Sequence, residues 1–185
     1  MAEGILSVRE LQEKDIELIT GYWLNADAAF LAGMGVDLNK MPTHDQWIEM
    51  LSGQLGVIYN EKKSYGIIWE EDGIQIGHCN VTPIIFGQEA FMHLHLWNGK
   101  LRKRGTGTEL VKMSLHYFFK NLQLKRIFSE PYALNAAPNK TLPKAGFEFV
   151  KEYITTPGYL NFEQPVNRWE LSYDKYSSLH ETKQS

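Results

Sequence analysis

Apolar residues recur at helical spacing in two stretches of the N-terminal third of the chain. In residues 13–25 they form one face that includes Ile19 and Trp23, which predicts a helix after a short strand at residues 5–9. A stretch containing glycine and proline then predicts a loop. Thr43 is a typical N-cap residue, so a second helix is expected to follow it.

The period of the pattern changes after residue 64. Residues 65–69 and 74–81 have the composition of strands, and Asp72-Gly73 between them predicts a tight hairpin turn. Residues 88–97 predict a further strand. The remaining elements are expected in the order helix, strand, helix, strand, strand, at residues 108–122, 125–130, 136–145, 147–155 and 166–173. This order predicts one mixed α/β domain over residues 1–173, followed by a frayed polar tail at 174–185.

Composition narrows the function classes. The 185 residues include five Trp, nine Tyr and nine Phe, enough for a substantial core, and the net charge of −3 argues against a broad nucleic-acid surface. No apolar run is long enough to span a bilayer, and the N-terminus lacks the features of a signal peptide, so we expect a cytoplasmic protein without a membrane partner. The single cysteine, Cys79, excludes an internal disulfide and lies in an apolar stretch, which predicts burial.

A glycine-containing basic segment leads directly into the strongest predicted helix. It consists of Arg102, Lys103, Arg104, Gly105, Thr106 and Gly107, with Thr108 as the expected helix start. Glycines let successive backbone N–H groups point at one anion, and the helix adds its positive N-terminal end. The segment therefore predicts a pyrophosphate site; the alternative is a glycine turn surrounded by solvated charges.

This segment, Arg-x-x-Gly-x-Gly between a strand and a helix, resembles the acetyl-CoA loop of the GNAT N-acetyltransferase superfamily. A second block supports the resemblance: Glu130-Pro131, Asn135-Ala136-Ala137 and Lys144-Ala145-Gly146-Phe147 are similar to the superfamily's N-x-A…K-x-G-F helix. The resemblance covers roughly residues 5–173. The segments at 93–96 and 155–158 are similar to the branch of aminoglycoside 6′-N-acetyltransferases and siderophore acetyltransferases.

The resemblance implies a mostly antiparallel sheet with two central splayed parallel strands, 88–97 and 125–130, and flanking helices. It implies acetyl-CoA as co-substrate, with the pyrophosphate on the amides of the loop and no metal. Asn135 matches the asparagine that binds the coenzyme arm; the alternative is a simple helix cap.

Two positions depart from the family's catalytic pattern. The tyrosine that many members use as general acid is replaced by Leu142, and Tyr132 stands where the branch has an acidic residue. Tyr132 could act as the acid, contact the acceptor or pack in the core. His93 matches the residue of the branch that contacts the amine.

The chemistry requires a base as well, because an alkylamine is protonated at neutral pH and must lose a proton before it attacks a thioester. Histidine has a suitable intrinsic pKa, and His93 and His95 share one face of their predicted strand. His93 is the first candidate and His95 the second; the alternative is that both only pack. With no third ligand at plausible spacing, the pair predicts no metal site.

The first two helices and their loop carry aromatic and acidic residues, namely Trp23, Asp27, Phe30 and Trp47. In the superfamily this region shapes the acceptor pocket, so an aromatic, acidic pocket for a cationic amine is one hypothesis and core packing the other. We expect acetyl transfer from acetyl-CoA to a primary amine or hydroxylamine of a small polar molecule by direct attack. The alternatives are a protein N-terminal acetyltransferase of the ribosomal-protein type and a non-catalytic CoA-binding module.

Overall fold

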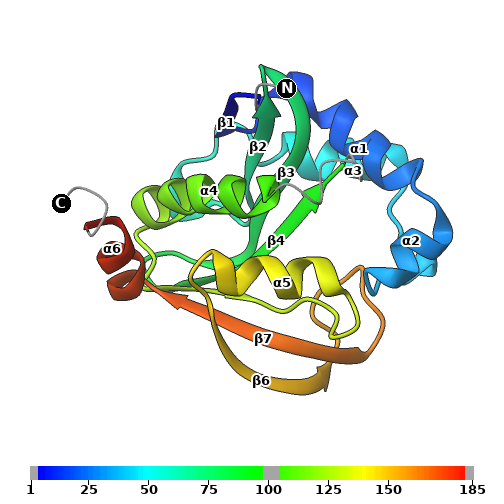
Figure 1. Ribbon diagram of the computed structural model, residues 1–185. Helices are drawn as coiled ribbons and strands as arrows, with labels where there is room; N and C mark the ends of the chain where they lie inside the picture. The colour runs from blue at the N-terminus through cyan, green and yellow to red at the C-terminus, as the bar shows by residue number, and fades with distance from the viewer. Residues whose placement is uncertain (1–3, 98–104, 182–185) are drawn as a thin grey trace.

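The structure is a computed structural model that describes residues 4–97 and 105–181. Within these ranges seven strands form one sheet in the order β1-β2-β3-β4-β5-β7-β6 (Figure 1). The strands are β1 (Leu6–Glu10), β2 (Tyr65–Glu71), β3 (Ile74–Ile85), β4 (Glu89–Leu96), β5 (Arg126–Ser129), β6 (Glu148–Thr155) and β7 (Gln164–Ser172). Only β4 and β5 pair in parallel; every other neighbouring pair is antiparallel. The predicted fold class is confirmed.

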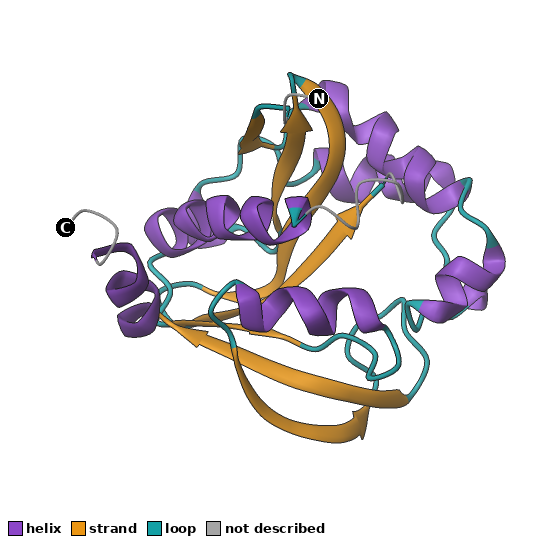
Figure 2. Ribbon diagram, in the orientation of Figure 1, coloured by secondary structure: helices purple, strands orange, loops and turns teal. Residues whose placement is uncertain are grey.

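Helices cover both faces of the sheet (Figure 2). They are α1 (Ile16–Leu24), α2 (Ala28–Gly33), α3 (His44–Ser52), α4 (Thr106–Leu122), α5 (Ala136–Lys144) and α6 (Tyr173–Glu181), with short 3₁₀ turns η1 (Glu13–Asp15), η2 (Leu38–Lys40) and η3 (Tyr59–Glu61). Figure 1 shows α4 and α5 side by side on one face, whereas α1 and α3 contact each other on the other side.

Alternation along β2 builds one core on each face. Ile67 and Trp69 pack with α4 in the larger core, while Ile68 between them packs with Trp23 of α1 and Trp47 of α3 in the smaller one. All three strand side chains are fully buried. A strand buried on both faces carries a continuous apolar run, as the sequence shows here.

Two local signals have the predicted geometry. The Thr43 hydroxyl accepts a hydrogen bond from the Gln46 amide (3.4 Å), and the Gln46 side chain accepts one from the Thr43 amide (2.8 Å), which forms a capping box for α3. In the β2–β3 hairpin, Asp72 and Gly73 have φ values of 53° and 77°. Positive φ at both positions fits the twist that flanking strands require.

The central strands separate after a short parallel ladder. Pairing of β4 with β5 extends only from Glu89–Arg126 to Phe91–Phe128. One residue further on, the hydroxyl of Ser129 donates to the carbonyl of Met92 (2.9 Å), and β4 continues to Leu96 paired only with β3. The two strands therefore splay, as predicted.

Three expectations were wrong at the level of elements. Helix α4 begins at Thr106, two residues before the predicted start at Thr108. Residues 28–33 form α2 instead of loop, because the Asp27 carboxylate caps the amides of Ala29 and Phe30. The expected polar tail contains α6, held by a tertiary contact: Tyr176 is buried and stacks on Phe119 with 4.6 Å between ring centroids.

Candidate active site

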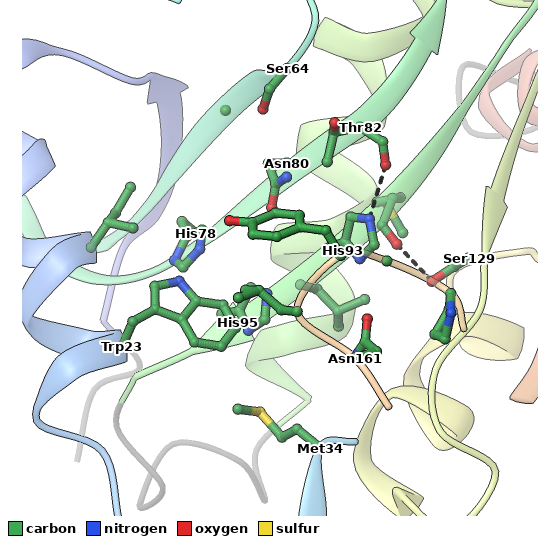
Figure 3. A pocket seen from close by; sticks show the side chains of 18 of the residues that line it. Trp23, Met34, Ser64, His78, Asn80, Thr82, His93, His95, Ser129 and Asn161 are labelled. Atoms are coloured by element: carbon green, nitrogen blue, oxygen red, sulfur yellow. Dashed lines mark hydrogen bonds between the residues drawn. The ribbon is translucent and has the colours of Figure 1, made fainter. Parts of the chain in front are cut away.

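A cavity of about 520 Å³ lies on the α1/α3 side of the splayed strands (Figure 3). Its walls come from α1, α3, β2, β3, β4, the segment after β5 and the loop at residues 157–161. This size falls within the range of small-molecule sites. The cavity therefore has room for an acceptor beside the gap between β4 and β5.

Four polar side chains from two neighbouring strands line the cavity as cross-strand pairs. His78 on β3 stands opposite His95 on β4, and Asn80 stands opposite His93. The alternation of the sequence correctly placed His93 and His95 on one face. Sequence reasoning missed His78 and Asn80, although with Thr82 they repeat every second residue and so share a face of β3.

His93 is oriented by a backbone carbonyl. Its Nε2 lies 3.0 Å from the carbonyl oxygen of Thr82 (Figure 3). This carbonyl is available because the β3–β4 register shifts between Val81 and Ile84, so that it takes no part in the ladder. Since a carbonyl can only accept, Nε2 carries the hydrogen in the neutral ring and Nδ1 keeps its lone pair. No described residue hydrogen-bonds this Nδ1.

The surroundings keep His93 neutral at physiological pH. Burial of the imidazole lowers its pKa below the usual value, and the hydrogen bond to Thr82 and the charge of Glu130 offset only part of that effect. A neutral imidazole that borders a cavity and has an unprotonated nitrogen can accept a proton. The geometry thus suits His93 for general-base work.

The other two histidines of the cavity are engaged by aromatic neighbours. The rings of His78 and His95 stack with centroids 4.7 Å apart, and Trp23 lies edge-on to His95 at 4.8 Å. Trp97 Nε1 donates to His78 Nδ1 (2.8 Å), while Tyr22 Oη lies 3.3 Å from His95 Nδ1. Burial lowers the pKa of His78 to about 3 and holds that of His95 well below its usual value. Both rings are neutral components of the wall.

Tyr132 also lines the cavity, in the segment that follows β5. Its backbone forms a bridge with Val166 of β7, and its ring lies edge-on to Phe162 at 5.9 Å. Tyr132 and His93 border the same cavity. Glu130, just before it, accepts a hydrogen bond from Tyr153 (2.5 Å).

The predicted phosphate loop is only partly within the described residues. Arg102, Lys103 and Arg104 lie outside them, whereas Gly105 precedes α4 with φ of 78°. Thr106, Gly107 and Thr108 form the first turn of α4, where the Thr108 and Glu109 amides bond back to the Gly105 carbonyl. The amides of Thr106 and Gly107 precede these bonds and are among those that a helix start leaves free for an anion.

The two glycines give a test of whether this helix start fits a phosphate. A Cβ added at Gly105 or Gly107 would meet no atom of the described residues within 4 Å. The positive φ of Gly105 favours glycine at that position. Gly107 is helical, so neither crowding nor backbone conformation requires a glycine at position 107. Open space above the backbone at a helix start matches the close approach of a phosphate group.

Asn135 and Leu142 belong to the second block of residues that resembles the family. Asn135 is the N-cap residue of α5, yet its side chain makes no capping hydrogen bond, and it lines the cavity. The cap alternative for this side chain therefore has no support. Leu142 is fully buried in the larger core and does not line the cavity.

The aromatic residues of the first helices are wall residues as well as core. Trp23 and Trp47 stack in parallel at 5.5 Å and line the cavity, although both are more than nine-tenths buried. Asp27 does not line it: its carboxylate is used as the α2 cap, on the surface. Phe30 packs on the smaller core and does not line the cavity either. The hypothesis that Asp27 makes the pocket acidic is not supported, and Trp23 and Trp47 fit the alternative of core packing while also lining the cavity.

Other chemistries find little support in the described residues. Cys79 is fully buried in the larger core, and burial raises the pKa of its thiol far above the usual value. Among the described residues, no three His, Cys, Asp or Glu side chains are arranged to hold a metal ion. No helix in the described ranges combines the length and apolar character needed to cross a bilayer.

Comparison with known proteins places the chain. Residues 6–148 match the family model for the acetyltransferase (GNAT) domain. The chain belongs to the GNAT acetyltransferase family. No curated protein matches its sequence significantly. Because it belongs to this family, the chain is an acyl-CoA-dependent acetyltransferase domain, as predicted.

Solved structures of this GNAT domain's fold include enzymes for three kinds of acceptor. A spermidine N-acetyltransferase from Vibrio cholerae in complex with CoA and spermine has a TM-score of 0.75 at 16% identity, over 93% of this chain and 98% of that one. The aminoglycoside acetyltransferase AAC(6′)-Ib in complex with coenzyme A gives 0.71 at 15%, over 95% and 99%. A ribosomal α-N-protein acetyltransferase in complex with coenzyme A gives 0.73 at 13%, over 92% and 95%. At these identities the similarity establishes the fold.

Proposed function

We propose that this GNAT domain transfers an acetyl group from acetyl-CoA to a primary amine or hydroxylamine of a small molecule by direct attack, with His93 as the general base. The observation that carries the proposal is the hydrogen bond from His93 Nε2 to the Thr82 carbonyl, which leaves Nδ1 as the free basic atom. A cytoplasmic location remains part of the proposal.

In the proposed reaction the acceptor enters the cavity as an ammonium ion and gives a proton to His93. The amine nitrogen then forms a bond to the acetyl carbon, the carbon–sulfur bond breaks, and coenzyme A leaves as a thiolate. The nitrogen gives up a second proton as the amide forms, the thiolate takes up one proton, and the proton on His93 passes to solvent. A base with a pKa somewhat below 7 is neutral under these conditions and still accepts protons transiently. Burial lowers the pKa of His93 below its usual value, so its imidazole is neutral and available to accept the proton.

Residues of the chain fit the coenzyme at two places. The amides of Thr106 and Gly107 at the start of α4 would hold the pyrophosphate, with Gly105 forming the turn and Thr108 completing the first helical turn beside it. The basic residues Arg102, Lys103 and Arg104 would add charge. Asn135, whose side chain makes no cap bond, would hydrogen-bond the coenzyme arm. Bound acetyl-CoA supplies the activated acetyl group as a thioester.

Direct attack is favoured over a covalent acetyl-enzyme. The only cysteine, Cys79, is fully buried away from the cavity, and its thiol has a raised pKa, which suppresses the nucleophilic thiolate. Tyr132 is the proposed proton donor to the leaving thiolate, because it lines the cavity whereas Leu142 at the usual tyrosine position is buried in the core.

A thiol-release assay with acetyl-CoA tests the proposal against a panel of monoamines, polyamines, aminoglycosides, hydroxylamines and peptides. Turnover of a small amine, accompanied by the mass of its acetyl product, supports it. Turnover of peptides alone would replace it with protein N-terminal acetylation. Coenzyme binding by calorimetry without turnover of any acceptor would identify a non-catalytic binding module.

A further inference from the structure

The walls of the cavity narrow the choice of acceptor. Resting on the proposed function, we propose that the acceptor is a monoamine with an apolar body, and that polyamines and aminoglycosides are poor substrates. The residues that carry this inference are one acidic side chain that is already paired and one continuous apolar wall.

Only one carboxylate borders the cavity among the described residues. It belongs to Glu130, whose side chain is 7% exposed. Its Oε1 accepts a hydrogen bond from Tyr153 (2.5 Å) and lies 3.3 Å from Nη1 of Arg168. Both contacts are made by Oε1, and the charge of Glu130 is balanced within the protein by the guanidinium of Arg168.

No other side chain of the described residues that line the cavity carries a negative charge. His78 and His95 are neutral in their aromatic surroundings, and Lys63 at the edge is itself a cation. Among the described residues, the only carboxylate that a second ammonium group of the acceptor could meet in the cavity is Glu130, which Arg168 already pairs. Burial of an unpaired charge is among the most unfavourable events in a protein interior.

The side of the cavity formed by α1, α3 and the adjacent loops is hydrophobic. We define as the apolar wall the residues Ile19, Trp23, Met34, Trp47, Met50 and Leu160. His93 borders the same cavity from β4. An amine that reaches His93 therefore has its body against hydrocarbon and aromatic surface, where contact with apolar groups is favourable.

A matched pair of substrates isolates the second charge. n-Hexylamine and cadaverine have the same length and differ only in ending with a methyl or an ammonium group. In the thiol-release assay we expect kcat/KM for n-hexylamine to exceed that for cadaverine by at least roughly tenfold, after allowance for the two equivalent amines of the diamine. An equal or better value for cadaverine, or efficient acetylation of spermidine, would overturn the inference while leaving acetyl transfer to small amines intact.

A wall variant provides a second measurement. Met50 is 39% exposed at the edge of the apolar wall and has no part in the proposed chemistry. Met50→Glu places a carboxylate there and should narrow the preference for n-hexylamine at least several-fold, whereas the neutral Met50→Gln should not. An unchanged preference in Met50→Glu would contradict the assignment of this wall to the acceptor. Turnover of no amine at all by the wild type would remove the proposed function together with the inference.

Discussion

Nε2 of His93 lies 3.0 Å from the carbonyl oxygen of Thr82 on the neighbouring strand β3. This contact fixes the tautomer of the imidazole, because only a protonated nitrogen can donate to a carbonyl. The ring therefore has a single basic atom, Nδ1.

The activity should depend on pH through His93. Burial lowers the pKa of His93 below its usual 6.5, and a base works in its neutral form. We expect kcat to be constant above pH 6.5 and to fall only at lower pH, as Nδ1 becomes protonated. The pH profile of kcat measures this. The residual activity of His93→Gln should lack that acid limb, and an acid limb retained in the variant would assign it to another group.

Substitution at the start of α4 should abolish coenzyme binding. Gly105→Val and Gly107→Val place side chains where the phosphate must approach the backbone. Gly107 is the cleaner test because it is helical and an added side chain meets open space, so its substitution should leave folding unharmed. Gly107→Ala is the mildest such change. Arg102→Ala should weaken binding less, since the backbone amides remain.

Calorimetric titration with coenzyme A checks these variants, and circular dichroism confirms that they fold. Gly21→Ala in α1 is a matched helix-glycine control, because its added Cβ meets only the Asn25 side chain at 3.5 Å. Wild-type affinity in both valine variants would refute the phosphate site.

Tyr132→Phe separates the roles left open for the phenol. If the hydroxyl protonates the leaving thiolate, kcat falls while both substrates bind normally, because the interaction exists only in the transition state. Steady-state kinetics with each substrate varied in turn measures this. A rise confined to the acceptor KM would make Tyr132 a binding residue, and unchanged kinetics would make it structural.

Folding stability should decline in mild acid through the cavity histidines. Burial lowers the pKa of His78 from 6.5 to about 3, so the unfolded state binds more protons between these values. The contribution of His78 to the free energy of unfolding is therefore greatest above pH 6.5 and decreases as the pH falls toward 3. Urea unfolding at several pH values between 6.5 and about 5, where carboxylates contribute little, measures how steeply the free energy of unfolding changes with pH. This dependence should be weaker in His78→Phe than in the wild type. Equal slopes would contradict the assignment.

The sequence indicated most of the fold because its elements carry their own signals. The N-cap at Thr43 and the Asp72-Gly73 turn are local, and both formed as predicted. Helix α6 was missed because its polar sequence gives little helical periodicity. It is held by the contact of Tyr176 with Phe119, which lies far away along the chain.

The site was predictable only where a strand's alternation determines it. His93 and His95 share a face for that reason. The partner of His93 was not predictable, because the Thr82 carbonyl is freed by a register shift that depends on how β3 meets β4. The hypothesis of an acidic pocket was not supported, because Asp27 caps the start of α2. Aspartate is a preferred N-cap residue, so the sequence was equally compatible with that role.

The central claim is that Nδ1 of His93 takes the acceptor's proton. The most direct measurement is kcat for thiol release by His93→Ala, with acetyl-CoA and a turned-over amine both saturating. We predict a fall of roughly 10²–10⁴-fold, the effect of losing a general base, with coenzyme affinity nearly unchanged. Near-normal turnover in this variant would contradict the account and return His93 to a packing role.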